Sequence, residues 1–239
     1  MPRTLITLAT YNEIENLPRL VDEIEAVVPT ADLLVIDDNS PDGTGRWCTE
    51  RAADDPHLFC LHREAKLGLG SATLDGFQYA IAHGYDLVLN LDADFSHSPQ
   101  AIPSLIDRLS ASDSMPVDVA IGSRYVTGGK VEGWPWHRRV MSRCVNLYAR
   151  LLLRLPMRDC SGSFRCYRVD ALRRLDFDAF RSRGYSYLEE ILWRLKRTGT
   201  TFAEVPIVFV DREHGTSKIN LREAVAAIWI IFRLGLFGR

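Results

Sequence analysis

The 239-residue chain lacks the features of several specialised protein classes. Its five cysteines are odd in number, with no Cys-x-x-Cys pair and no nearby paired histidine. This pattern argues against a disulfide scaffold or a zinc site, and reduced thiols are the default of a cytosolic protein. No Ser-His-Asp or Cys-His arrangement stands out, so covalent catalysis by an activated side chain has no candidate.

Long apolar runs are also missing. The only membrane-like segment, residues 224–232, is nine residues long and is flanked by Arg222 and Arg233. A membrane-spanning helix needs about 20 residues, so we expect none here. We expect no secretory leader either, because Met1-Pro2-Arg3 leads directly into a strand pattern.

The composition is that of an ordinary globular protein, with 46% hydrophobic and 25% charged residues. The net charge is only −2, but it is unevenly distributed. From Arg124 to Arg174, eleven arginines and one lysine oppose three acids, which leaves +9 on this segment and −11 on the remainder. The basic segment indicates an anionic partner, either phosphate or membrane headgroups. The alternative is a solvated helix surface rich in arginine.

Strand-like and helix-like patterns alternate along the first half of the chain. Apolar runs predict strands at residues 4–9, 32–36, 58–61, 87–91 and 117–121. Helical periodicity predicts helices that begin near residues 17 and 44, and helices at 71–83 and 99–109. This succession predicts an α/β protein with a mostly parallel sheet and helices on both of its faces.

The pattern is less regular after residue 122. A long amphipathic helix is predicted at 140–155, a further helix at 188–196, and strands at 164–167 and 205–210. There is no internal repeat, low-complexity tract or linker. Residues 1–219 are therefore expected to form a single domain, followed by a C-terminal amphipathic helix at 220–239.

Two aspartates, Asp92 and Asp94, follow the apolar strand at 87–91. In an open α/β sheet, ligands bind beyond the carboxyl ends of the strands. Two hard oxygen ligands there suit Mg²⁺ or Mn²⁺, with the remaining coordination positions left to phosphate and water. This arrangement is typical of an enzyme that acts on a nucleotide diphosphate. The alternative is that the acids cap the next helix.

Polar residues also follow the first two predicted strands. Tyr11 could pack on a base or ribose, and Glu13 could accept hydrogen bonds from sugar hydroxyls or base N–H groups. The alternative is a helix start capped by Thr10 or Asn12. After the second strand, Asp38 could bind a base amino group or a ribose hydroxyl, although turn chemistry alone would also explain this position.

A glycine pair and several basic residues are considered as phosphate-binding candidates. Gly68-x-Gly70 lacks the third glycine of the dinucleotide fingerprint and follows the third strand, which argues against a Rossmann dehydrogenase. Arg124, at the end of the strand predicted at 117–121, can bind phosphate oxygens bidentately. Arg212 and Lys218 lie in a polar segment that could close over a diphosphate, or could simply be a solvated loop.

Seven motifs in this order resemble the polyprenyl-phosphate (dolichyl-phosphate) mannosyltransferases, which are inverting family 2 glycosyltransferases of the GT-A fold. The matching segments are residues 10–13, 35–44, 66–70, 92–97, 122–125, 161–165 and 211–218. The resemblance covers nearly the whole chain, and it implies transfer of mannose from GDP-mannose to a polyprenyl monophosphate. Spacing alone would not have given segments 159–165 and 184–190 a role.

The resemblance implies a set of donor-site residues. Contacts to the nucleoside are implied for Ala9, Tyr11, Glu13, Ile36 and Asp38. Contacts to the diphosphate are implied for Asp92, Ala93 and Asp94, with Asp94 as the principal metal ligand, and for Arg124, Arg212 and Lys218. Relatives often carry Gln where this chain has Ser96, so the resemblance does not supply that further protein ligand for Mg²⁺ or Mn²⁺. Relatives also often have Pro in place of Ala9, which removes no chemical group.

The implied reaction is attack of a lipid phosphate oxygen on the anomeric carbon, with GDP expelled. The phosphate is already ionised near neutral pH and needs no strong base. Candidates to hold it are Arg138, Arg139, Ser142 and Arg143, next to Trp134 and Trp136 in a segment that suits a membrane interface. The alternative is a tryptophan-rich lid packed on the core.

We therefore expect a peripheral protein on the cytoplasmic face of a membrane, with no nucleic-acid partner. The helix at 220–239 could lie in the interface, dock on a small membrane partner subunit, or pack back on the sheet. Two other functions fit the same motifs. One is a related transferase that uses UDP-glucose or another nucleotide sugar, and the other is a nucleotide-sugar-binding module without turnover.

Overall fold

A seven-stranded sheet forms the centre of the computed structural model, which describes residues 2–110, 116–182, 184, 186–211 and 221–237. The strands lie in the order β3 (Leu58–His62), β2 (Asp32–Asp37), β1 (Thr4–Thr10), β4 (Leu87–Asp92), β7 (Arg165–Arg168), β5 (Val119–Ser123) and β8 (Phe202–Pro206). All run parallel except β7, which is antiparallel to both of its neighbours. The prediction of a mostly parallel sheet is confirmed.

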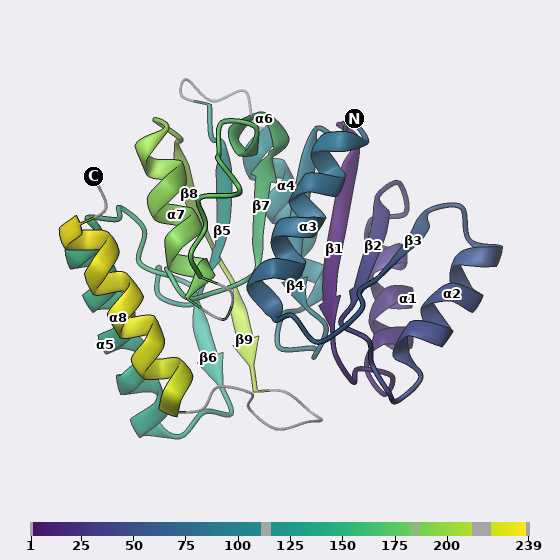
Figure 1. Cartoon of the computed structure of the whole chain (residues 1–239), viewed down its shortest axis with the longest axis horizontal. Helices are drawn as coiled ribbons and strands as arrows, with labels where there is room; N and C mark the ends of the chain where they lie inside the picture. The colour runs from purple at the N-terminus through teal and green to yellow at the C-terminus, as the bar shows by residue number, and fades with distance from the viewer. Residues whose placement is uncertain (1, 111–115, 183, 185, 212–220, 238–239) are drawn as a thin grey trace.

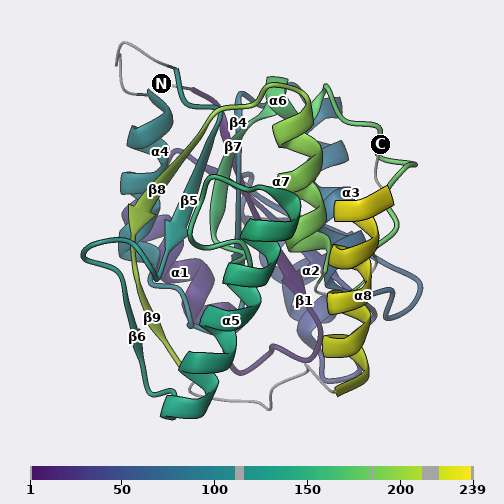
Figure 2. The same ribbon diagram turned by 90° about the vertical axis from the view of Figure 1, so that its left-hand side faces the viewer.

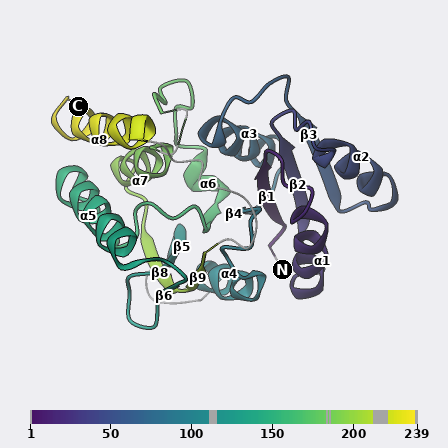
Figure 3. The ribbon, with the colours of Figure 1, turned by 90° about the horizontal axis from the view of Figure 1, so that it is seen from below.

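Helices cover both faces of this sheet, as predicted (Figure 3). One face carries α1 (Leu17–Val27), the short 3₁₀ turn η1 (Pro99–Ala101) and α4 (Ile102–Ser110). The other carries α3 (Leu69–Ala82), α6 (Val169–Leu172) and α7 (Tyr187–Arg197), while α2 (Thr44–Asp54) flanks β3. Successive strand side chains point to opposite faces, so Leu5 joins one buried cluster and Ile6 the other.

The packing of α3 on the sheet depends on a glycine. A Cβ atom at Gly76 would lie 3.0 Å from the Cδ1 of Ile36 and 3.1 Å from the Cγ2 of Thr7. Any larger residue would push the helix away from β1 and β2. Glycine at this position therefore fixes the distance between α3 and the strands that carry the nucleotide motifs.

A second, two-stranded sheet lies at the carboxyl ends of the main strands, at the lower edge of Figure 1. It pairs β6 (Lys130–Glu132) with β9 (Val208–Val210). The single strand predicted at 205–210 is wrong, because β8 ends at Pro206 and the chain then continues into β9 of the other sheet. Proline lacks the N–H needed to extend a ladder, which is consistent with the break. The motif analysis did not predict β6.

Two helices lie side by side at one end of the molecule, α5 (Trp136–Leu153) and α8 (Leu221–Phe237) (Figures 1 and 2). The Tyr148 hydroxyl donates to the Ile228 carbonyl at 3.2 Å, and Ile231 and Leu234 of α8 are buried. Helix α5 begins at Trp136, four residues before its predicted start. Among the described residues, no helix has both the length and the hydropathy that a membrane crossing requires.

Candidate active site

The polar motifs of the first half of the chain meet at one edge of the sheet. In the strand register, Ala9 of β1 lies opposite Ile36 of β2 and Asp92 of β4. These three strands therefore end level with one another, and the loops that follow them emerge together. The Ile36 side chain is fully buried in the core, so a ligand can meet this residue only through its main chain.

The loops at this edge are held in defined conformations. Asn12, Asn39 and Phe95 all have positive φ angles, of 57°, 58° and 58°. Asparagine tolerates this region, but a bulky residue such as Phe95 adopts it only when its surroundings enforce it. The Asn12 N–H also donates to the Ser40 hydroxyl at 2.9 Å, which ties the loop after β1 to the loop after β2. The edge is therefore a preformed rim.

Asp92 and Asp94 occupy this rim at the end of β4. The Asp92 side chain is 32% exposed, whereas Asp94 is buried. One oxygen of Asp94 accepts the Ser96 N–H at 3.1 Å and the Ser96 hydroxyl at 2.5 Å. Ser96 thus orients the carboxylate. Among the described residues, no group of three or more His, Cys, Asp or Glu side chains could hold a metal ion. The rim therefore offers a cation two carboxylates, and its other coordination positions would be filled by phosphate and water.

His97, the last residue of the matching segment 92–97, lies beside the two aspartates and had no role assigned from the sequence. Its ring is buried between Phe164 and Phe209, with centroid distances of 5.1 and 5.3 Å, and its Nδ1 is 4.0 Å from an Asp92 oxygen. Burial lowers the pKa of His97 to about 4, and the nearby Asp94 only partly offsets this. The imidazole is therefore neutral at pH 7 and can support the rim without adding charge to it.

The predicted nucleoside side of the rim contains an unexpected ion-pair network. Asp38 pairs with Arg63 and accepts the Gly68 N–H at 2.9 Å. Arg63 also contacts Asp75 at 3.1 Å and donates to the Ser71 hydroxyl at 2.6 Å. No sequence motif pointed to Arg63, because its partners lie up to 25 residues away. The network fixes Asp38 and joins the end of β2 to the start of α3.

The first loop contributes its predicted residues to the same side. The Lys66 ammonium lies 3.9 Å from the centre of the Tyr11 ring. Glu13 accepts the Asn16 side-chain amide at 3.0 Å, and its own N–H donates to the Thr44 hydroxyl at 3.0 Å. The structure thus brings Tyr11, Glu13 and Asp38 together, while their contact with a nucleoside stays a prediction.

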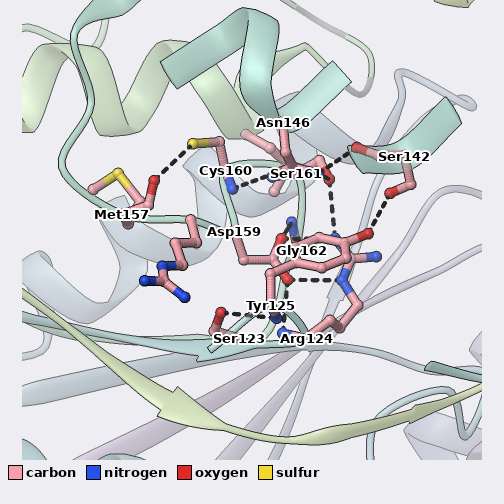
Figure 4. Close-up of polar contacts among 12 residues, drawn as sticks. Ser123, Arg124, Tyr125, Ser142, Asn146, Met157, Asp159, Cys160, Ser161 and Gly162 are labelled. Carbon is pink, nitrogen blue, oxygen red and sulfur yellow. Dashed lines mark hydrogen bonds and ion pairs between the residues drawn. The ribbon is translucent and has the colours of Figure 1, made fainter. Parts of the chain in front are cut away.

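Arg124, at the end of β5, is held by a fully buried aspartate (Figure 4). Its Nε and Nη2 donate to the two oxygens of Asp159, each at 2.7 Å, and its backbone N–H donates to the same carboxylate at 3.0 Å. Burial opposes charge on Asp159, but the Arg124 guanidinium more than compensates and lowers the pKa of the carboxyl. The motif at 159–165, which spacing could not explain, therefore holds this arginine.

The same loop is tied to α5. Asn146 accepts the Cys160 N–H at 2.6 Å and donates to the Ser161 hydroxyl at 2.9 Å, and Ser161 in turn accepts from Arg124 at 2.9 Å (Figure 4). The Tyr125 hydroxyl is 2.7 Å from that of Ser142 on α5. The basic helix is thus positioned against the end of β5.

The four residues predicted to hold an acceptor phosphate have different surroundings. Arg139 and Arg143 line a cavity of about 280 Å³ together with Arg124 and Lys130. Arg138 instead pairs with Asp211 at 3.0 Å and stacks over Trp134 at 4.1 Å, so the structure gives it another partner. Arg212 and Lys218 lie outside the described residues, and their roles stay predictions.

Glu189, near the start of α7, is a buried acid that sequence reasoning left without a role. Burial raises the pKa of its carboxyl from 4.5 to about 7, although Arg165 acts in the opposite direction. The folded state therefore binds a proton more tightly than the unfolded chain does. Between about pH 4.5 and 7, the free energy of unfolding should fall as the pH rises, by up to about 3 kcal/mol from this group.

Replacing Glu189 with Gln should remove this pH dependence. We expect the variant to match the wild type near pH 5 and to exceed its melting temperature above pH 7, because no buried charge then forms. Urea unfolding at several pH values measures the difference. An unchanged slope of unfolding free energy against pH would contradict the assignment of this proton to Glu189.

Comparison with solved structures places the fold. The structure resembles glucosyl-3-phosphoglycerate synthase from Mycobacterium tuberculosis, solved with Mn²⁺, UDP and glucosyl-3-phosphoglycerate, with a TM-score of 0.68, 20% identity, and coverage of 99% of this chain and 79% of that one. A second structure of that synthase, with Mn²⁺ and UDP-glucose, gives 0.69 and 21%, with coverage of 99% and 79%. The mostly parallel sheet with helices on both faces matches the GT-A fold of these structural neighbours.

Sequence comparison gives the family. The model described as "Glycosyl transferase family 2" matches residues 6–176. The chain is 42% identical over 237 residues to the undecaprenyl-phosphate mannosyltransferase of Micrococcus luteus, covering 99% of this chain and 96% of that one. It is 43% identical over 238 residues to the polyprenol monophosphomannose synthase of Mycolicibacterium smegmatis, covering 99% and 88%. The chain belongs to glycosyl transferase family 2.

Proposed function

We propose that this protein transfers mannose from GDP-mannose to a polyprenyl monophosphate with inversion at the anomeric carbon. The observation that carries the proposal is the identity of 42–43%, over nearly the whole chain, to two enzymes whose names specify mannose and a polyprenyl phosphate. The rim at the ends of β1, β2 and β4 supports it, because the strand register brings the candidate donor residues to one edge of the sheet.

The donor lies across this rim in the proposal. Tyr11, Glu13 and Asp38 face the nucleoside, and Asp92 and Asp94 face the diphosphate together with Mg²⁺ or Mn²⁺. The rim fits such a cation because its donor atoms are carboxylate oxygens, which these hard ions prefer. When bound, the cation would neutralise the charge that develops on the departing diphosphate. Arg124 adds guanidinium N–H donors at a fixed position beside it, because Asp159 holds the group in place and balances its charge.

The acceptor phosphate occupies the 280 Å³ cavity between β5, β6 and α5. Arg139 and Arg143 provide guanidinium groups for its oxygens, and Lys130 adds a point charge. A phosphate monoester is already ionised at neutral pH, so the side chains need to orient it and not to deprotonate it. This accounts for a site in which positively charged residues outnumber candidate bases.

The enzyme acts at the cytoplasmic face of a membrane in this proposal. Helices α5 and α8, which lie side by side (Figures 1 and 2), expose several large apolar side chains. We call this the α5–α8 apolar surface, and it consists of Trp136, Val140, Met141, Leu147, Leu151, Ile228, Trp229, Phe232 and Leu236. A large exposed apolar surface with tryptophan and a neighbouring row of arginines suits a lipid interface or a small membrane partner subunit.

The reaction can be tested directly with purified protein. Radiolabelled GDP-mannose, Mn²⁺ and a polyprenyl phosphate dispersed in detergent should give a mannosyl lipid on thin-layer chromatography, and omission of the metal or of the lipid should abolish it. UDP-glucose is the matched control donor, because the structural neighbours were solved with that nucleotide sugar. Transfer from UDP-glucose but not from GDP-mannose would contradict the assignment of GDP-mannose as the donor. Binding of the donor without transfer to any polyprenyl phosphate would instead favour a binding module.

A further inference from the structure

A second basic cavity adjoins the acceptor cavity, and its residues Arg150 and Arg158 have no part in the reaction described above. Its volume is about 510 Å³, and its polar lining comes chiefly from Arg143, Asn146, Arg150 and Arg158. It shares Arg124, Tyr125, Gly129 and Arg143 with the acceptor cavity. The two cavities are therefore neighbours, and Arg150 lies about two helical turns beyond Arg143 along α5.

Most guanidinium groups that line this cavity are in no ion pair with a described residue, although the Glu204 carboxylate accepts the backbone N–H of Arg158 at 2.8 Å. No acidic residue lines it, and among the residues that the structure describes only Arg124 of its lining has an ion-pair partner, Asp159. Within the part of the chain that the structure describes, no carboxylate lies within 4.0 Å of the guanidinium groups of Arg143, Arg150 or Arg158. The Nε of Arg150 is also buried and finds no hydrogen-bond acceptor among these residues. A buried donor without an acceptor indicates that an anion completes the site.

The cavity opens beside the α5–α8 apolar surface. Residues three, four and seven apart share one side of a helix, so Arg143, Leu147 and Arg150 lie in one row along α5. Leu151 follows on the same side and is 71% exposed. Tyr148, which contacts α8, lies on the other side of this apolar stripe. The order around α5 is therefore cavity, arginines, exposed leucines and then α8.

We propose that this cavity binds the phosphodiester headgroup of an anionic membrane phospholipid, distinct from the acceptor lipid. The guanidinium groups of Arg150 and Arg158 bind the phosphate oxygens as forks, and the anion relieves repulsion among three cations. The acyl chains run over Leu147 and Leu151 into the bilayer. The inference rests on the membrane association proposed above, and it goes beyond that association by naming the headgroup chemistry and its site.

The bound headgroup orients the enzyme. Because Arg143 borders both cavities, a phospholipid held by Arg150 and Arg158 places the acceptor cavity at the level of the neighbouring headgroups. A polyprenyl phosphate, whose own phosphate lies at that level, can then enter without leaving the bilayer. The site thus recruits the enzyme to anionic membranes and aligns it with its lipid substrate.

The test compares two variants of the full chain that remove equal charge. The first is Arg150→Gln with Arg158→Gln, and the second is Arg46→Gln with Arg174→Gln, which are exposed and lie on other parts of the surface. Sedimentation measures binding to phosphatidylcholine vesicles with and without an equal amount of phosphatidylglycerol. We expect the first variant to bind phosphatidylglycerol vesicles at least about tenfold more weakly than the wild type, and the control less than about twofold more weakly.

Three results would overturn the inference. They are equal weakening in both double variants, no preference of the wild type for phosphatidylglycerol, and displacement from vesicles by millimolar inorganic phosphate, which would make the ligand a free anion. If the double variant has a lowered melting temperature, Arg158→Gln alone replaces it in the test, because Arg158 is exposed and its substitution should leave the fold intact. Mannosyl transfer in detergent should be unchanged in Arg150→Gln with Arg158→Gln, so a failure of the headgroup site is distinguishable from a failure of the reaction.

Discussion

Replacing Asp94 with Asn is expected to lower the rate of mannosyl transfer by about a thousandfold, which corresponds to ~4 kcal/mol of transition-state stabilisation. The amide keeps an oxygen that can accept the Ser96 hydroxyl and N–H, so the local loop should survive. What is lost is the negative charge that binds the divalent cation at the leaving diphosphate. Initial rates with saturating GDP-mannose, Mn²⁺ and polyprenyl phosphate measure this effect.

Asp107→Asn provides a control for this variant. Asp107 lies exposed on α4, and its replacement removes the same charge away from the rim. We expect normal transfer from the control, and a melting temperature for Asp94→Asn close to that of the wild type. If Asp94→Asn kept more than a tenth of the activity at any Mn²⁺ concentration, Asp94 would not be a principal metal ligand.

Replacing Asp159 with Asn is expected to destabilise the fold by about 3–5 kcal/mol, because it leaves the buried Arg124 guanidinium without a countercharge. For a chain of this size, the melting temperature should fall by roughly 10 °C. Transfer should also weaken, since Asp159 is the positioning residue that aims Arg124 at the rim. Urea unfolding and the KM for GDP-mannose measure the two effects separately.

A double-mutant cycle measures whether Arg124 and Asp159 stabilise the fold through their ion pair or through independent packing contacts. Arg124→Gln combined with Asp159→Asn removes both buried charges, so the double variant should be more stable than Asp159→Asn alone. It should remain as inactive as Arg124→Gln. Strictly additive losses of stability would show that the two side chains do not depend on each other.

The sequence predicted the acidic rim because its signals are local. Asp92 and Asp94 directly follow a strand, and the parallel arrangement of β1, β2 and β4 brings the ends of these strands together. A periodic apolar pattern is sufficient to place such strands. The positions of Ala9, Tyr11, Glu13 and Asp38 at the same edge follow from the same reasoning.

The residues that hold the rim in place could not be predicted in this way. Arg124 meets Asp159 only because β7 inserts antiparallel between β4 and β5, and a pattern of apolar residues does not give the direction of an inserted strand. Asp38 meets Arg63 because these residues directly follow Asp37 and His62, which are partners in the register of β2 with β3. Both ion pairs depend on long-range topology. The resemblance to a known family supplied the donor, the lipid acceptor and the roles of Arg212 and Lys218, and none of these follows from spacing.

The measurement that tests the central claim most directly is a crystal structure with GDP-mannose and Mn²⁺, with anomalous scattering used to locate the metal. The account predicts one manganese peak bound by a carboxylate oxygen of Asp94 and by both phosphates of the donor, at the carboxyl end of β4. Nucleotide density at this edge, with the metal absent or bound away from Asp92 and Asp94, would contradict it.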